Sequence, residues 1–112
     1  MNMHNLKWSQ SERVIARKAY NKAYKKEMDS IRTEVIRQVQ NYKEPKNIWQ
    51  LHSYLTEKRK EIDQKYNYRY SVLLGVFARL IKEGFLSLDE LTGLSEDKIM
   101  IIKTILGLGK ED

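Results

Sequence analysis

The feature that most constrains the fold of this chain is a long stretch without helix-breaking residues. Its first proline is Pro45 and its first glycine is Gly75. Ahead of Pro45, apolar and aromatic residues recur in steps of three and four, the spacing of one helical face. They are Ala16, Tyr20, Tyr24, Met28, Ile31, Val35, Val39 and Tyr42. The pattern predicts one long helix that begins near Ser9 or Ser11, both common N-cap residues, and ends before Pro45.

Such a helix is longer than the domain to which it belongs. At 1.5 Å per residue it spans roughly 45–50 Å, whereas a domain of 112 residues is only about 30 Å across. Its apolar face therefore extends past its own domain and needs a cover. A second copy of the chain is the simplest cover, so we predict a helical homodimer.

The remaining residues also have helical patterns. Asn47 and Gln50 form a capping-box pattern that predicts a second helix over residues 47–66. A third helix is predicted from residue 68 or 69 to 83, where Gly84 would stop it.

Two shorter helices are predicted near the C-terminus. Ser87 and Glu90 form another capping box and begin a short helix over residues 87–92. A last helix over 95–106 should end at Gly107. We therefore expect an all-α fold and a single domain over residues 1–112, with a two-helix stalk (9–66) and a small helical head (68–107).

Composition excludes several classes of protein. The chain has no cysteine, which rules out disulfides, thiolate nucleophiles and Cys–zinc sites. Its 41% hydrophobic and 32% charged residues make it too apolar for a disordered chain and too charged for a membrane protein. Residues 1–8 lack a signal-peptide pattern, and the apolar run 72–81 is too short to span a bilayer. We expect a soluble cytoplasmic protein with no membrane insertion.

Positive charge is concentrated in the first segment. Residues 1–43 hold ten Lys and Arg against four acidic residues, whereas residues 44–112 hold eleven of each. A nucleic-acid surface is one interpretation, but no helix-turn-helix spacing or basic-zipper heptad follows. We expect the cations to line the outer face of a helix and keep a nucleic-acid-associated helical dimer as an alternative.

No constellation of catalytic or metal-binding residues is present. His4 and His52 are far apart in sequence, with no carboxylate at metal-ligand spacing. Residues 107–110, Gly-Leu-Gly-Lys, resemble a phosphate loop but follow a helix rather than a strand. Ser53 adjoins His52 in sequence, but the side chains of neighbouring residues on a helix diverge by about 100°. The two therefore cannot form a nucleophile–base pair. We therefore predict that the protein is not an enzyme, has no catalytic residue and binds neither a metal nor a cofactor.

The second predicted helix carries a face with an unusual mixture of residues. Trp49, His52 and Arg59 recur at helical spacing, with Thr56 and Asp63 in the same series and Ser53 beside it. Trp and Arg are enriched at the residues that dominate protein–protein binding. The candidate partner-binding residues are Trp49, His52, Ser53 and Arg59.

Several stretches resemble one known family in both order and spacing. They are Trp8-Ser9-Gln10, Lys18-Ala19-Tyr20, Trp49-Gln50-Leu51-His52, Lys58-Arg59-Lys60-Glu61-Ile62-Asp63, Lys65-Tyr66, Ser71-Val72-Leu73, Val76-Phe77-Ala78, Glu83-Gly84 and Leu88-Asp89-Glu90-Leu91. With these motifs the chain resembles the fluorescence recovery proteins of cyanobacterial photoprotection, over most of its length.

The resemblance implies a specific activity. Members of this family are all-helical homodimers that bind the photoactivated orange carotenoid protein, with its C-terminal domain as the expected contact. They speed its return to the dark form and help detach it from the phycobilisome, which restores fluorescence, and they use no cofactor. The resemblance therefore implies a cytoplasmic protein associated with the phycobilisome on the thylakoid.

The family's functional positions are matched only in part. Its Trp, His and Arg on the second helix correspond to Trp49, His52 and Arg59, whereas Ser53 stands where an Asp is usual. An aromatic residue is usual at Gly75, and a Lys of the last helix falls at Ile101, with Lys103 nearby as a substitute. The alternative is a related helical dimer that binds a different protein partner.

Overall fold

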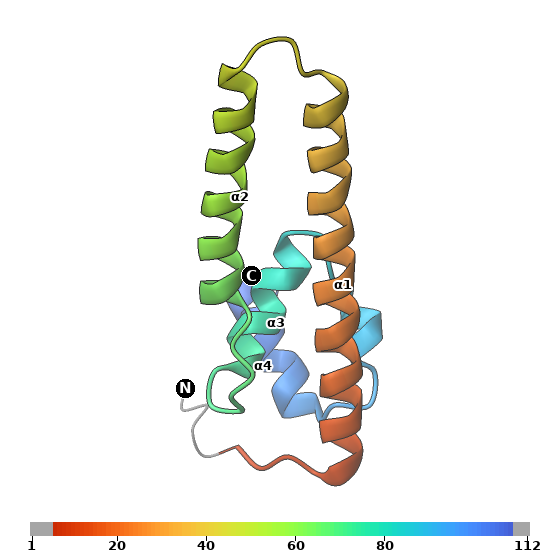
Figure 1. The fold of residues 1–112 in the computed structure, drawn as a ribbon. Helices are drawn as coiled ribbons and strands as arrows, with labels where there is room; N and C mark the ends of the chain where they lie inside the picture. The colour runs from red at the N-terminus through yellow and green to blue at the C-terminus, as the bar shows by residue number, and fades with distance from the viewer. Residues whose placement is uncertain (1–5, 109–112) are drawn as a thin grey trace.

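The computed structural model describes residues 6–108, which form an all-α fold (Figure 1). The elements in chain order are α1 (Gln10–Gln40), α2 (Lys46–Lys65), α3 (Leu73–Lys82), the 3₁₀-helix η2 (Leu88–Leu91) and α4 (Glu96–Leu106). None of these helices is both long and apolar enough to cross a membrane.

Helix α1 begins at a complete capping box. The Ser9 hydroxyl accepts a hydrogen bond from the Glu12 N–H at 3.1 Å, and the Glu12 carboxylate accepts one from the Ser9 N–H at 3.0 Å. The helix then runs for 31 residues without a break and ends before Pro45. The predicted long helix is therefore confirmed, with Ser9 rather than Ser11 as its N-cap.

The prediction that Asn47 caps α2 is wrong. Pro45 occupies the N-cap position, with a φ of −52° that suits the start of a helix. The Asn47 side chain instead accepts hydrogen bonds from the N–H groups of Lys43 and Glu44, each at 2.9 Å. Asn47 thus closes the turn between α1 and α2 from a position already inside the second helix.

Helix α3 begins later than predicted, at Leu73 rather than at residue 68 or 69. The segment before it contains Tyr68 and Tyr70, whose rings pack edge to face with centroids 5.5 Å apart. Tyr68 also packs at 90° against Tyr20 of α1, at 4.8 Å. The residues before Leu73 thus make tertiary aromatic contacts in an irregular segment and not on a helix.

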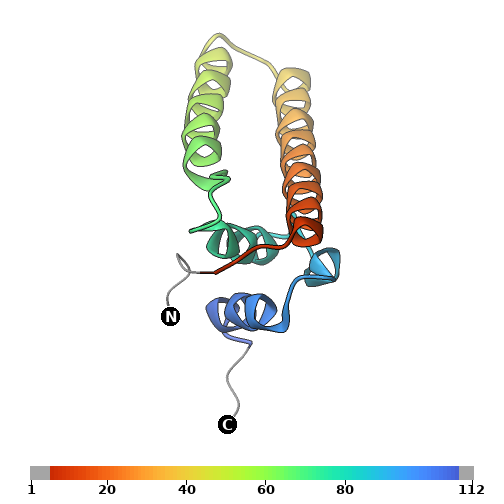
Figure 2. The same cartoon turned by 90° about the horizontal axis from the view of Figure 1, so that it is seen from below.

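The core lies between the N-terminal half of α1 and the three short helices (Figures 1 and 2). Small side chains of α1, at Ala16, Ala19 and Ala23, are buried in this core and allow close packing. Its largest fully buried side chains are Phe77, Leu73, Leu74, Leu80, Leu91 and Ile102.

The molecule is elongated because the part of the stalk near the turn at Pro45, formed by the end of α1 and the start of α2, extends beyond this core. Its principal extents are 53 × 35 × 23 Å and its radius of gyration is 17.2 Å, compared with about 13 Å for a compact domain of this length. Much of the predicted apolar face of α1 is exposed there, including Tyr24, Met28, Val39 and Tyr42. The buried face of α1 keeps Ala16 and Ile31 of the predicted series but includes Ala19 and Ala23 in place of Tyr24 and Met28.

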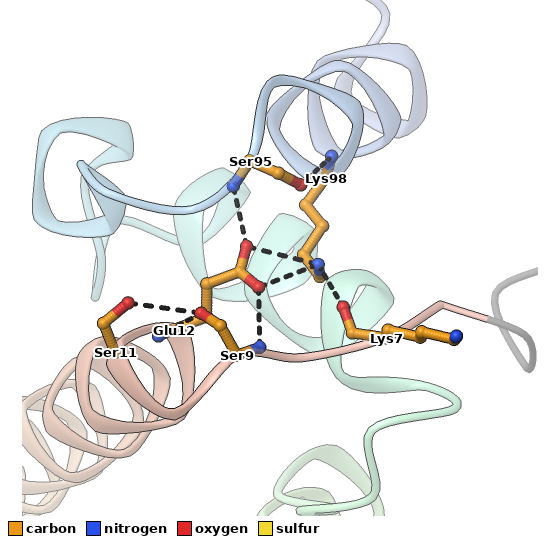
Figure 3. Close-up of polar contacts among 6 residues, drawn as sticks. All are labelled: Lys7, Ser9, Ser11, Glu12, Ser95 and Lys98. Atoms are coloured by element: carbon orange, nitrogen blue, oxygen red, sulfur yellow. Dashed lines mark hydrogen bonds and ion pairs between the residues drawn. The ribbon is translucent and has the colours of Figure 1, made fainter.

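Two buried ion pairs join α1 to other helices. The Glu12 carboxylate contacts the Lys98 ammonium at 3.1 and 3.2 Å and also accepts a hydrogen bond from the Ser95 N–H at 2.8 Å (Figure 3). The Lys98 ammonium also donates a hydrogen bond to the Lys7 carbonyl oxygen and lies over the Trp8 ring. The second pair joins Glu27 of α1 to Lys65, the last residue of α2, at 2.6 Å.

Stability at acid pH should depend on the first pair. Burial alone raises the pKa of Glu12, but the N–H groups of Ser9 and Ser95 and the Lys98 ammonium together lower this pKa from 4.5 to about 2. A pKa lowered in the folded state stabilises the protein above the ordinary value of 4.5, and this stabilisation is lost as pH falls toward 2. The loss should amount to about 3 kcal/mol.

Chemical denaturation of the parent and of Glu12→Gln across this pH range tests the expectation. Glu12→Gln should be less stable near neutral pH but lose less stability on acidification, because it cannot take up this proton. Other carboxyl groups titrate equally in both proteins, so the difference in slope isolates Glu12. Parallel curves for the two proteins would contradict the assignment.

Candidate functional site

The four candidate binding residues all lie exposed on α2. Trp49 is 67% exposed, although Trp is usually largely buried. His52, one turn further on, packs its ring edge to face against Trp49 with centroids 6.4 Å apart. Ser53 and Arg59 are also exposed, and helical spacing places each within about 80° of Trp49 around the helix axis. The structure therefore brings Trp49 and His52 into contact.

Arg59 belongs to a separate cluster on the same helix. Its Nε donates to both carboxylate oxygens of Asp63, at 3.1 and 3.3 Å. A surface pair of this kind contributes at most about 1 kcal/mol, so a partner carboxylate can replace Asp63 at little cost. Ten residues separate Arg59 from Trp49, which corresponds to roughly 15 Å along the helix. The candidate residues form an extended strip and not a pocket.

An apolar groove near the end of the stalk was not predicted as such from the sequence. It has a volume of about 330 Å³ and lies between the end of α1 and the start of α2. Val39 and Tyr42 line one wall, and Ile48 and Leu51 line the other. Sequence periodicity placed Val39 and Tyr42 on the apolar face of the first helix, but only the turn at Pro45 brings them beside Ile48 and Leu51.

Gly75 and Ile101, the two positions where the resemblance leads us to expect other residues, have different surroundings. A Cβ atom added at Gly75 would meet no other heavy atom within 4 Å, so α3 has room there for a larger side chain. Ile101 is buried in the core. Lys103 lies two residues further along α4, about 200° around the helix, and so does not occupy the same face as Ile101.

The strip on α2 has the character of a binding surface. Within residues 6–108, no three His, Asp or Glu side chains gather closely enough to hold a metal ion. His4 and the last two residues of the run 107–110 lie outside the described residues. An exposed indole, an imidazole and a guanidinium offer apolar area and hydrogen-bond donors, which suit recognition of another protein.

Comparison with known proteins shows which family this chain resembles. The family described as photoprotection regulator fluorescence recovery protein matches residues 8–106 of this chain. The fluorescence recovery protein of Synechocystis sp. is 42% identical over 101 residues, which cover 90% of this chain and 93% of that protein.

Solved structures of such proteins share the fold. The fluorescence recovery protein of Fremyella diplosiphon is 45% identical, with a TM-score of 0.85 over 88% of this chain and 97% of that one. The structure from Synechocystis sp. is 41% identical, with a TM-score of 0.86 over 91% of this chain and 100% of that one. The chain therefore belongs to the fluorescence recovery protein family, whose members are regulators of photoprotection and not enzymes.

Proposed function

We propose that this protein binds the photoactivated orange carotenoid protein, accelerates its return to the dark form and thereby restores phycobilisome fluorescence. The observation that carries the proposal is the exposed strip on α2, which retains Trp49, His52 and Arg59 in a chain that matches the family over residues 8–106. This function places the protein in the cytoplasm, at the thylakoid-bound phycobilisome.

Binding can accelerate a relaxation only through differential affinity. A partner that binds the relaxing states of the carotenoid protein more tightly than the activated state shifts the population toward the dark form and lowers the barrier. Trp49 supplies a rigid apolar anchor for this contact, and Arg59 can exchange Asp63 for a carboxylate of the partner. We place the contact on the C-terminal domain of the carotenoid protein.

Removal of the Arg59 guanidinium should abolish most of this activity. Arg59→Ala should weaken partner binding by about 2 kcal/mol or more, as expected for a residue that dominates an interface. Optical measurement of the reversion of photoactivated carotenoid protein should show acceleration by the parent and little by the variant. Lys60→Ala removes the same charge one residue away, from a side chain that is also mostly exposed, and should retain the parent's activity.

A substitution at Ser53 should change the activity in the opposite direction from Arg59→Ala. Ser53→Asp restores the carboxylate usual at this position of the family and should increase the acceleration of reversion. If the parent and Ser53→Asp both fail with carotenoid proteins from several sources, the proposed activity is wrong and the partner is a different protein.

We also propose that the single domain formed by residues 1–112 acts as a homodimer whose interface includes the apolar groove of the stalk. Ile31 is a poor site for testing this, because it is buried within the protomer and a charge there would also disturb α1. Val39 is 59% exposed in the single chain. A Glu at Val39 therefore tests contacts between chains more directly.

Val39→Glu should convert the dimer to a monomer because a carboxylate buried in an apolar interface without a partner costs several kcal/mol. Light scattering at micromolar concentration should give two chains per particle for the parent and one for the variant, with unchanged helicity. Val14→Glu, at an equally exposed apolar position far from this groove, should remain dimeric. A monomeric parent would rule out the dimer.

A further inference from the structure

The first part of α1, residues 10–27, separates its charges by sign. Its two acidic residues there, Glu12 and Glu27, are buried in the ion pairs with Lys98 and Lys65. The cations of the same segment are all exposed, namely Arg13, Arg17, Lys18, Lys22, Lys25 and Lys26. The outer surface of this part of α1 is therefore strongly positive, although its sequence contains charges of both signs.

Three of these cations gather where α1 passes the irregular segment before α3. Lys22 and Lys25 are already paired with carboxylates, each at 3.0 Å. By contrast, Arg13, Arg17 and Lys18 have no carboxylate within 4 Å among residues 6–108. Their charge is available to a partner.

Both arginines lie over tyrosine rings, and the contact of Arg17 is the closer one. The Arg17 guanidinium carbon lies 3.6 Å from the centroid of Tyr68, and that of Arg13 lies 5.6 Å from the centroid of Tyr70. A stacked guanidinium keeps its N–H donors in its own plane, where they remain able to bind a carboxylate. The rings thus restrict the positions of the two cations before any partner arrives.

A groove of about 420 Å³ runs between these groups. Its lining includes Arg13, Val14, Arg17, Lys18, Tyr68 and Tyr70, and no acidic residue. Val14 is an apolar residue that is 60% exposed beside three cations. The groove therefore offers positive charge at its sides and apolar surface between them.

We propose that this groove is a second docking surface and binds an acidic segment of a partner protein. Carboxylates of the segment would pair with Arg13, Arg17 and Lys18, and an apolar side chain between them would cover Val14. Nucleic acid fits less well, because bases bind single-strand sites by stacking on aromatic faces, and the faces of Tyr68 and Tyr70 carry guanidinium groups. The inference does not depend on the carotenoid-protein activity proposed for α2.

A blocked twelve-residue peptide of three Asp-Glu-Leu-Gly repeats provides the probe, with an Asn-Gln-Leu-Gly peptide as its neutral control. NMR spectra of the isotope-labelled full chain report where each peptide binds. The acidic peptide should shift the amide signals of Arg13, Arg17, Tyr68 and Tyr70, and the neutral peptide should not. Absence of these shifts at millimolar acidic peptide would overturn the proposal.

Matched variants separate the groove from general charge attraction. Arg13→Gln/Arg17→Gln should weaken binding of the acidic peptide by about tenfold or more, equivalent to about 1.4 kcal/mol. Arg32→Gln/Lys43→Gln removes the same charge from exposed positions further along the chain and should change the affinity by less than about twofold. Equal losses in both variants would overturn the proposal, as would tighter binding of a short DNA strand to the same groove at physiological salt.

Discussion

Replacement of Lys65 by Met should lower the free energy of unfolding by about 3–5 kcal/mol. The Lys65 ammonium is fully buried and donates to Glu27 at 2.6 Å and to Glu83 at 2.5 Å. Without Lys65, the Glu27 carboxylate remains buried with the Tyr66 hydroxyl, at 2.9 Å, as its remaining hydrogen-bond donor. An uncompensated buried charge of this kind is among the most destabilising changes in a protein core.

A second substitution should rescue much of this loss. In Lys65→Met/Glu27→Gln the fully buried pair becomes neutral, and Glu83, which is only partly buried, keeps its ion pair with Arg79. Replacement of both partners of a buried pair is often nearly neutral. Denaturant titration of the parent, the single variant and the double variant measures the effect. Lys82→Met, which removes an exposed ammonium of α3, should stay within about 0.5 kcal/mol of the parent. A similarly small loss for Lys65→Met would contradict the buried pair.

Replacement of Phe77 by Ala should lower the free energy of unfolding by about 3–5 kcal/mol, through lost apolar burial and the cavity left behind. Phe77 is completely buried at the centre of α3, in the core that joins the short helices to α1. The Phe77→Ala protein should therefore unfold at a markedly lower temperature.

Thermal denaturation followed by circular dichroism measures this effect. Met100→Ala is the matched control, because Met100 is a large apolar residue of α4 that is mostly exposed. Its melting temperature should remain close to that of the parent. If Phe77→Ala melted at the parent's temperature, the core would not depend on α3 and the packing described above would be wrong.

The two buried ion pairs connect the stalk to the head at separate points. Glu12 joins the start of α1 to α4, and Glu27 joins α1 to the end of α2 and, through Lys65, to Glu83 at the end of α3. Fifteen residues separate these glutamates, or roughly 22 Å along the helix. Both the strip on α2 and the groove on α1 are thereby positioned on a stalk that is fixed relative to the core.

The candidate site could be located from sequence because its residues share one helix. Helical spacing alone predicts that Trp49, His52 and Arg59 point to the same side of residues 47–66. The structure agrees and shows that these side chains are exposed. Their role in partner binding stays a prediction, and so does the dimer, because both depend on contacts with other molecules.

The sequence by itself determined the helices and several of their ends. Ser9 with Glu12 begins α1, Pro45 separates α1 from α2, and Gly107 ends α4 with a φ of 81°. These features are local, since a cap or a positive φ involves only a few neighbouring residues. The stretches that resemble the fluorescence recovery family were also readable without coordinates.

Only the tertiary structure decided which charged groups are buried and where α3 begins. Glu12 and Lys98 are 86 residues apart in sequence, and Glu27 and Lys65 are 38 apart. Periodicity describes a residue's place on its own helix but carries no information about which distant side chain will face it. For the same reason, the sequence pattern did not show that Tyr68 packs against Tyr20 of α1, in an irregular segment that precedes the start of α3 at Leu73.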